Sequence, residues 1–166
     1  AAGNERMQIN VKFEHRAGPL GPAPIVSGPA LPLGDYANLS AESAFSYGAL
    51  VYVEGKPDGA LISRMDTADN YRGWDLWLQK GQIGAHIIDQ WEAQASKSIS
   101  KNALKPKQWH HVMITFDPKR KASEAIAIYV DGTKQEVVVE QANLPAKNQI
   151  NTKAPLVIGG RHGSGN

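Results

Sequence analysis

The chain has 166 residues, no cysteine, and 18 lysines and arginines against 16 aspartates and glutamates. This length fits one domain with one core, and the lack of cysteine excludes a disulfide framework, a catalytic thiol, a thiolate metal site and c-type haem attachment within the chain. The small net charge of +2 argues against nucleic acid as a partner, and no apolar run reaches the roughly 20 residues of a membrane span, which argues against membrane insertion.

The first part of the chain is predicted to contain one strand and one irregular stretch. In residues 7–14, Ile9, Val11 and Phe13 alternate with polar residues, which predicts an edge strand. Residues 17–32 carry five prolines and three glycines, a density that excludes both a helix and a central strand.

Two strands follow, and a polar loop comes after them. Residues 45–53 place apolar side chains at every second position, and residues 59–66 form the next strand. In the loop, Asp66, Asp69 and Asn70 offer oxygen atoms at close spacing, as a calcium site requires. The same side chains also suit Asx turns, and turn chemistry is favoured because the fixed glycine and glutamate of an EF-hand loop are missing.

Residues 74–79 and 83–88 predict two strands joined at Lys80-Gly81, with an apolar inner face. If these strands are neighbours, the outer face carries Asp75, Trp77, Gln79 and His86, with Tyr52 nearby. An aromatic ring beside hydrogen-bonding groups on an open sheet face suits a sugar, whose C–H face stacks on the indole. Alternatively, the loop predicted at 89–105 covers Trp77, and both interpretations stay open.

Two further residues complete the predicted ligand-binding set, Arg64 and Trp91. A lone tryptophan in a polar stretch is either an exposed binding platform or an anchor that pins the loop. Anchoring is favoured for Trp91, because an exposed indole lowers solubility.

The second half of the chain is organised around a hairpin at residues 109–132. Val112, Ile114 and Phe116 occupy every second position of its first arm, and Ile126, Ile128 and Val130 do so in its second, as in a strand with one buried face. Asp131-Gly132 then forms a turn that tolerates positive φ. Two short strands are predicted after it, at 136–140 and at 156–158.

The sequence offers little for catalysis. Glucanases on sheet folds need two convergent carboxylates, and no run of alternating acids occurs here. His110 and His111 are adjacent in a strand and point to opposite faces, so they do not readily share a metal ion, and we interpret both as structural. No G-x-S-x-G nucleophile elbow occurs.

Several motifs in order carry a resemblance to a known family. They are ALPLGDYANLS at 30–40, FSYGALVYV at 45–53, GALISRMD at 59–66, YRGWDLWLQKGQIGAHII at 71–88, WHHVMITFD at 109–117 and PLVIGG at 155–160. Together they resemble the laminin-G-like branch of the concanavalin A-like lectin and glucanase superfamily. The combination of RGWDLWL, GAHII and WHHV is most similar to domains of large secreted planctomycete proteins with c-type cytochrome modules.

The resemblance implies an all-β, two-sheet antiparallel jelly-roll sandwich and a binding module outside the cytoplasm. We therefore expect residues 1–166 to be a single domain of a larger secreted protein. After a segment like PLVIGG the family usually continues into one more strand, so here that strand is either missing or replaced by residues 7–14.

Three functions remain open at this stage. The leading one is a non-catalytic module that binds polysaccharide or another glycan on an open sheet face, with no cofactor other than possible calcium. The second is an interaction domain that contacts protein, including other domains of its parent. The third is a glycoside hydrolase, whose acids would have to come from separate strands.

Overall fold

The computed structural model describes residues 14–26, 30–145, 147 and 149–163. Nearly all of its regular structure is strand, with one short 3-10 helix, η1 (Ala122–Glu124). In chain order, the strands are β1 (His15–Gly18), β2 (Gly21–Pro24), β3 (Leu31–Gly34), β4 (Phe45–Tyr52), β5 (Gly59–Asp66), β6 (Arg72–Gln79), β7 (Gln82–Gln90), β8 (Gln94–Ala103), β9 (Trp109–Phe116), β10 (Ile126–Val130), β11 (Thr133–Lys134), β12 (Val137–Ala142) and β13 (Leu156–Ile158).

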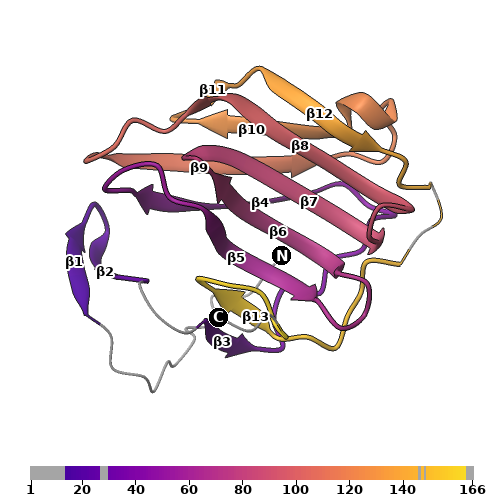
Figure 1. Ribbon diagram of the computed structural model, residues 1–166, viewed down its shortest axis with the longest axis horizontal. Coiled ribbons are helices and arrows are strands. Elements are labelled where there is room, and N and C mark those ends of the chain that lie inside the picture. Colours follow the sequence, from indigo (N-terminus) through magenta and orange to yellow (C-terminus); the bar gives the residue numbers. More distant parts are fainter. Residues whose placement is uncertain (1–13, 27–29, 146, 148, 164–166) are drawn as a thin grey trace.

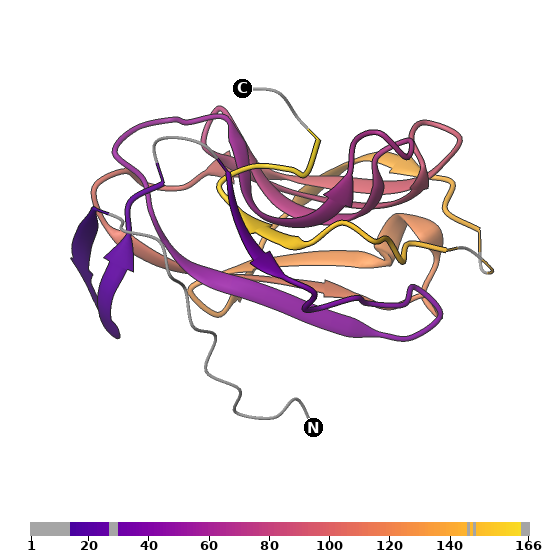
Figure 2. The same cartoon turned by 90° about the horizontal axis from the view of Figure 1, so that it is seen from below.

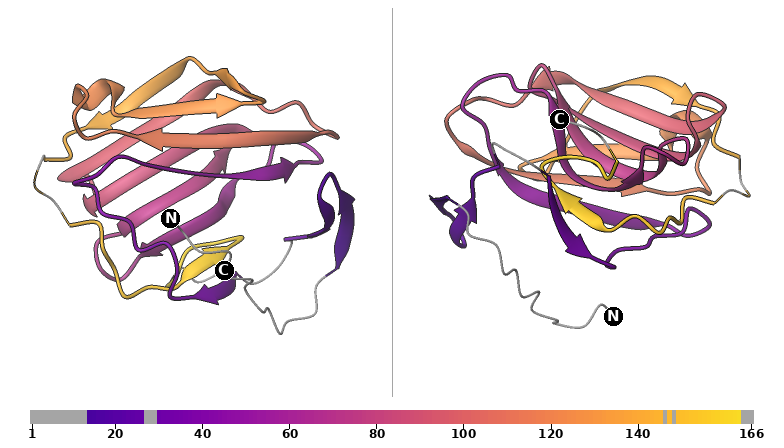
Figure 3. Two further views of the ribbon diagram at one scale, coloured as in Figure 1. Left: turned by 180° about the vertical axis from the view of Figure 1, so that it is seen from behind. Right: turned by 60° about the horizontal axis from the view of Figure 1, so that its bottom comes forward.

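Two sheets form the body of the molecule (Figure 1). The larger has the order β12-β8-β7-β6-β5-β13-β3, and the smaller has the order β11-β10-β9-β4. Paired strands in both sheets are antiparallel. Seen edge-on in Figure 2, the sheets form two layers, and Figure 3 shows from behind how the four-stranded sheet lies across the seven-stranded one. The predicted all-β, two-sheet antiparallel sandwich is confirmed.

The predicted hairpin is the centre of the four-stranded sheet. Strands β9 and β10 pair with Ile114 opposite Ile128 and Phe116 opposite Ile126, and all four side chains are buried. Asp131 and Gly132 turn the chain with φ values of 50° and 78°, the left-handed region that a tight hairpin turn demands. This turn leads from β10 into β11, and the Asp131 carboxylate accepts a hydrogen bond from the backbone N–H of His111 at 2.8 Å.

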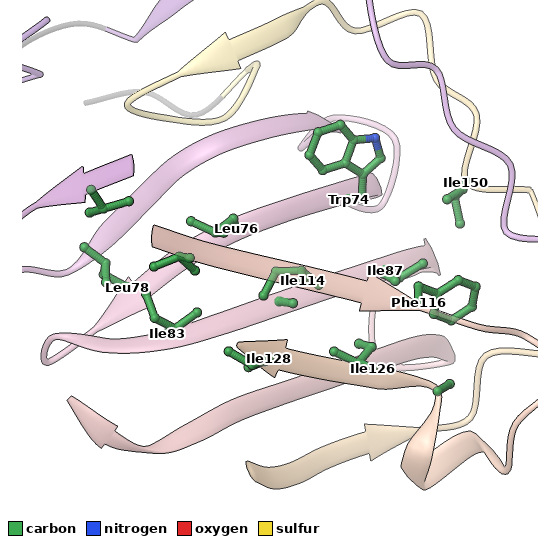
Figure 4. Packing of buried hydrophobic residues seen from close by; sticks show 14 of the residues in the cluster. Trp74, Leu76, Leu78, Ile83, Ile87, Ile114, Phe116, Ile126, Ile128 and Ile150 are labelled. Atoms are coloured by element: carbon green, nitrogen blue, oxygen red, sulfur yellow. The ribbon is translucent and has the colours of Figure 1, made fainter. Parts of the chain in front are cut away.

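The other half of the core comes from β6 and β7. Trp74, Leu76 and Leu78 of β6 lie beside the inward residues of β7, Ile83, Ala85 and Ile87. Figure 4 shows these side chains packed against Ile114, Ile126 and Ile128 of the facing sheet. The period-two pattern therefore identified the inner faces correctly, and the opposite faces of the same strands are turned away from the core.

The segment predicted as a loop over residues 89–105 is instead mostly strand. Strand β8 pairs along its length with both β7 and β12. Its positions facing the core are the buried serines Ser96, Ser98 and Ser100, so no apolar alternation marks it. The buried hydroxyl of Ser100 has two hydrogen-bond partners, as buried polar groups usually do. It accepts a hydrogen bond from the backbone N–H of Ile83 at 2.9 Å and donates one to the carbonyl of Asn102 at 2.7 Å.

The proline-rich stretch also forms strands, all at edges. β1 and β2 make a separate two-stranded hairpin beside the sandwich (Figure 1), and β3, with Pro32, is an outer strand of the seven-stranded sheet. Proline lacks a backbone N–H and is tolerated where one side of the strand is unpaired. The exclusion of a helix and a central strand holds, but the interpretation as irregular chain was wrong.

The end of the described chain lies inside the seven-stranded sheet. Strand β13 confirms the predicted segment 156–158 and pairs with both β5 and β3. The predicted strand at 7–14 lies outside the described residues except for residue 14.

The inner and outer faces of β9 make a direct stability test possible. We expect Ile114→Ala to lower the free energy of unfolding by about 2–5 kcal/mol, because a fully buried side chain leaves a cavity between the sheets. The matched control is Met113→Ala, at the neighbouring position on the outer face, for which we expect less than about 1 kcal/mol. Chemical denaturation measures both, and equal losses would contradict the assignment of the faces.

Candidate functional site

An open groove of about 940 Å³ lies on the outer face of the seven-stranded sheet, the face turned away from the core. The sheet bows toward the four-stranded layer in Figure 2. The residues of the groove that matter most for its chemistry are Tyr71, Trp77, His86, Trp91, Lys97 and Arg161. They come from β6, β7, β8, the adjoining turns and the segment after β13.

Strand register explains why these side chains share one face. Ser63, Asp75, His86 and Lys97 stand directly opposite one another on β5, β6, β7 and β8, so they form one polar row across the sheet. Residues paired in this way point to the same side. The predicted grouping of Asp75, Trp77 and His86 is present, and Gln79 also lines the groove at the end of β6.

Asp75 is the most tightly bound side chain of this face, with no exposed surface. Its Oδ1 accepts hydrogen bonds from the backbone N–H of His86 at 3.1 Å and lies 2.9 Å from Nδ1 of the same residue. Its Oδ2 accepts from the Nε and a terminal nitrogen of Arg161, at 2.8 and 2.5 Å. Burial alone raises the pKa of Asp75, but His86 and Arg161 outweigh it and hold the pKa below its usual value.

Trp77 forms the floor of the groove, because its side chain is only 7% exposed. Its indole lies flat on Gly84 of the neighbouring strand, where an added Cβ would come within 2.6 Å of the ring. The His86 ring stacks beside it, with the centroids 5.0 Å apart. The indole Nε1–H is buried and has no hydrogen-bond partner within the described part of the chain.

Trp91 and Tyr71 form the aromatic rim. Tyr71, 38% exposed, lies 6.1 Å from Trp91 between ring centroids. Trp91 follows β7, packs on a small outer cluster of Met65, Ile88 and Ala95, and meets the His86 ring edge-on at 5.4 Å. Trp91 therefore has the contacts of an anchor and also lines the groove, so its two predicted roles are compatible.

Lys97 covers the aromatic floor. Its Nζ lies 5.1 Å from the ring of Trp77 and 5.8 Å from that of Trp91, within the range of cation–π attraction. The ammonium also pairs with Glu140 of β12 at 2.6 Å. Lys97 belongs to the segment 89–105 that was predicted to cover Trp77, but it lies in strand β8 and not in a loop.

The segment after β13 forms a wall of the groove. Ser63 donates to the carbonyl of Gly160 at 2.8 Å, Thr67 donates to that of His162 at 3.0 Å, and Arg161 reaches Asp75 between them. Sequence reasoning missed Arg161, Lys97 and Tyr71. No local pattern marks them, since each joins the site through pairing with a distant strand.

Two predicted ligand residues lie elsewhere. Tyr52 belongs to β4, which pairs with β9 in the other sheet, and its ring lies against Trp109 and under the Arg16 guanidinium. Arg64 is opposite Trp74 and faces the core side, 2% exposed. It donates to the carbonyls of Tyr36 and Thr152 and pairs with Asp35. Both placements correct the expectation that these residues join Trp77.

The loop considered for calcium has other contacts. Asp66 Oδ1 accepts from the backbone N–H of Ala68 at 3.0 Å, the predicted turn chemistry, and Asp69 pairs with Arg72 at 2.8 Å. Asn70 has a positive φ of 50°, and its carbonyl accepts from the N–H of Trp91. Among the described residues, no group of three or more histidine, cysteine or acidic side chains could hold a metal ion.

Comparison with known proteins places this fold. The profile of a family described as the concanavalin A-like lectin/glucanases superfamily matches residues 27–166. Among solved structures, the chain is similar to the mouse laminin alpha1 chain, domains LG4-5, with a TM-score of 0.56 and 17% identity over 82% of this chain and 32% of that one. It is also similar to the binding domain of Paraclostridial Mosquitocidal Protein 1, with a TM-score of 0.63 and 14% identity over 95% of this chain and 40% of that one.

At these identities the likeness to the two structures concerns the fold alone, and the chain spans less than half of the length of either. No curated protein matches the chain. Within the described residues, no helix has the length and apolar character needed to cross a membrane.

The lowered pKa of Asp75 predicts a specific pH dependence of stability. An ionised, paired carboxylate contributes stability above its unfolded pKa of about 3.9, and that contribution is lost as the pH falls through the folded value. We expect Asp75→Asn to lower the free energy of unfolding at pH 7 by about 1.5–3 kcal/mol and to flatten its decline in acid. Denaturation between about pH 7 and pH 3 measures this.

Asp58→Asn is the matched control for this experiment, since Asp58 is an exposed carboxylate on the same groove. We expect it to keep the acid dependence of the unmodified protein. An acid slope that is the same in Asp75→Asn and in the unmodified protein would contradict the role assigned to the buried ion pair.

Proposed function

The chain belongs to the concanavalin A-like lectin/glucanases superfamily, and from this premise we propose that it is a non-catalytic carbohydrate-binding module. Its ligand is a polysaccharide or glycan held in the groove on the outer face of the seven-stranded sheet. The observation that carries this proposal is the aromatic rim of Tyr71 and Trp91 beside the hydrogen-bonding side chains of Gln79 and His86.

Groove and sugar match in chemistry and in size. A pyranose ring has apolar C–H faces that stack on aromatic rings and a perimeter of hydroxyls that need polar partners. The aromatic rim lies next to these hydrogen-bonding groups, since the ring of Trp91 meets the ring of His86 edge-on. The volume of about 940 Å³ lies at the upper end of the range for small-molecule sites and accommodates more than one sugar unit.

A binding role fits the acids of the groove better than hydrolysis. Retaining glycosidases need two carboxyl groups about 5–5.5 Å apart, and inverting ones need a wider pair, with both groups accessible. Of the described residues that line the groove, Asp58 is the one carboxylate, and the nearby Asp75 is inaccessible and bound to Arg161. This distribution supports a module without catalytic activity.

We place this module in a larger protein that acts outside the cytoplasm. The mouse laminin alpha1 structure and the binding domain of Paraclostridial Mosquitocidal Protein 1 are both longer than this chain. This supports the proposal that the chain is one domain of a multidomain parent. The resemblance to domains of secreted planctomycete proteins with c-type cytochrome modules supports the same setting.

The test is a glycan-array and polysaccharide pull-down screen with the unmodified protein and two rim variants, Trp91→Ala and Tyr71→Ala. We expect each variant to weaken binding at least about tenfold, because loss of an aromatic ring that stacks on the sugar costs more than about 1.4 kcal/mol of binding free energy. Circular dichroism checks that each variant folds.

The matched control is Tyr52→Ala, which removes an aromatic ring from the other sheet and should leave binding unchanged. Repeating the screen with calcium and with a chelator tests the calcium prediction, since loss of binding with the chelator would support a metal at Asp66, Asp69 and Asn70. Binding to no glycan under either condition would refute the proposal and favour the protein-interaction alternative.

A further inference from the structure

Charged side chains of both signs surround the groove in equal number. Among the described residues, the cations are Lys80, Lys97 and Arg161. The carboxylates are Asp58, on the groove, and Asp75 and Glu140, the ion-pair partners of Arg161 and Lys97. This balance bears on the charge of any ligand that the groove accepts.

Arg161 is committed to Asp75. Two of its nitrogens contact one carboxylate oxygen, and that carboxylate has no contact with solvent. An anionic ligand group that drew Arg161 away would leave a buried charge without this partner, which is strongly unfavourable. A cationic group cannot use Asp75 either, because the carboxylate is covered.

Lys97 is similarly engaged. Its ammonium pairs with Glu140 at 2.6 Å and lies over both indoles, and its side chain is only 16% exposed. A ligand carboxylate or sulfate would compete with Glu140 for the same ammonium. At the other end of the groove, Asp58 accepts a hydrogen bond from the backbone N–H of Lys80 at 2.9 Å, so one oxygen of the remaining acid is already engaged.

The hydrogen-bonding side chains left for a ligand lie outside the pairs of Lys97 and Arg161. The Nε1–H of Trp77 has no partner in the described chain, but it is buried in the groove floor and does not face a ligand. Nδ1 of His86 lies against Asp75, which leaves Nε2 of the ring for a ligand. Gln79 adds an amide. A purely apolar ligand would bury these groups without partners, which is unfavourable.

Resting on the carbohydrate-binding function proposed above, we propose that the groove selects uncharged saccharides. The ligand is a chain of neutral hexose or pentose units without carboxylate, sulfate or free amino groups. Its ring faces stack on the rim of Trp91 and Tyr71, and its hydroxyls, which both donate and accept, use the side chains of His86 and Gln79. The ion pairs Arg161–Asp75 and Lys97–Glu140 form a fixed wall of the groove and remain intact when the ligand binds.

Affinity electrophoresis with polysaccharide pairs that share a backbone tests this inference. The probes are hydroxyethyl-cellulose with carboxymethyl-cellulose, dextran with dextran sulfate, and galactomannan and xylan as further neutral chains, with chitosan as the cationic one. We expect retardation by at least one neutral probe, with no stronger retardation by any charged one. Because no ligand charge is involved, retardation should change less than about twofold between roughly 0.05 and 0.5 M salt.

Lys97→Met separates the two kinds of recognition, since it removes the ammonium but keeps a long side chain over the indoles. Neutral binding should stay within about threefold of the unmodified protein, and Trp91→Ala should abolish it. Retardation by charged probes alone, falling tenfold or more with salt and lost in Lys97→Met, would overturn the inference and leave carbohydrate binding intact. Retardation by no probe, with the protein folded, would refute the carbohydrate-binding function itself and the inference with it.

Discussion

The carboxylate of Asp75 joins the parts of the chain that shape the groove. It receives His86 from β7 and Arg161 from the segment after β13, and its own strand, β6, lies at the middle of the seven-stranded sheet. Taking this carboxylate out of water is unfavourable unless it is fully paired, so the arrangement of the three residues is fixed. The polar row and the wall of the groove both depend on that arrangement.

The same strands supply the core and the site. On β6, Trp74, Leu76 and Leu78 face the opposite sheet, and Asp75 and Trp77 face the groove. Close packing on the inner side holds the backbone in one position. The outward side chains of the same strands are therefore held in defined positions as well. The groove therefore rests on the rigid part of the fold, and the rim residues Tyr71 and Trp91 lie at the turns next to it.

Local alternation made much of this fold predictable from the sequence. The hairpin of β9 and β10, the inner faces of β4 and β6, and the pairing of β6 with β7 all follow from a period of two in adjacent segments. Strand β8 was not predicted because serines, which are polar, occupy its inward positions. They can be buried there because a hydroxyl such as that of Ser100 forms hydrogen bonds with nearby backbone groups.

The misplaced site residues show what alternation leaves open. Tyr52 was expected beside Trp77, but β4 pairs with β9, more than fifty residues later in the chain, and so belongs to the other sheet. On β5, Ser63 and Met65 face the groove side and Arg64 faces inward, where its terminal nitrogens donate to backbone carbonyls. Which face of a strand meets the core, and which strand lies beside it, are decided by pairing across the whole chain.

The position of Trp77 follows from the glycine opposite it. Gly84 has no side chain above the backbone of β7, and the indole of Trp77 fills that space and is nearly covered there. A buried ring cannot offer a broad stacking face, so stacking falls to the more exposed rim. What Trp77 contributes is a flat floor. The two tryptophans of this face therefore have different roles, and their difference in exposure follows from which residue each one packs on.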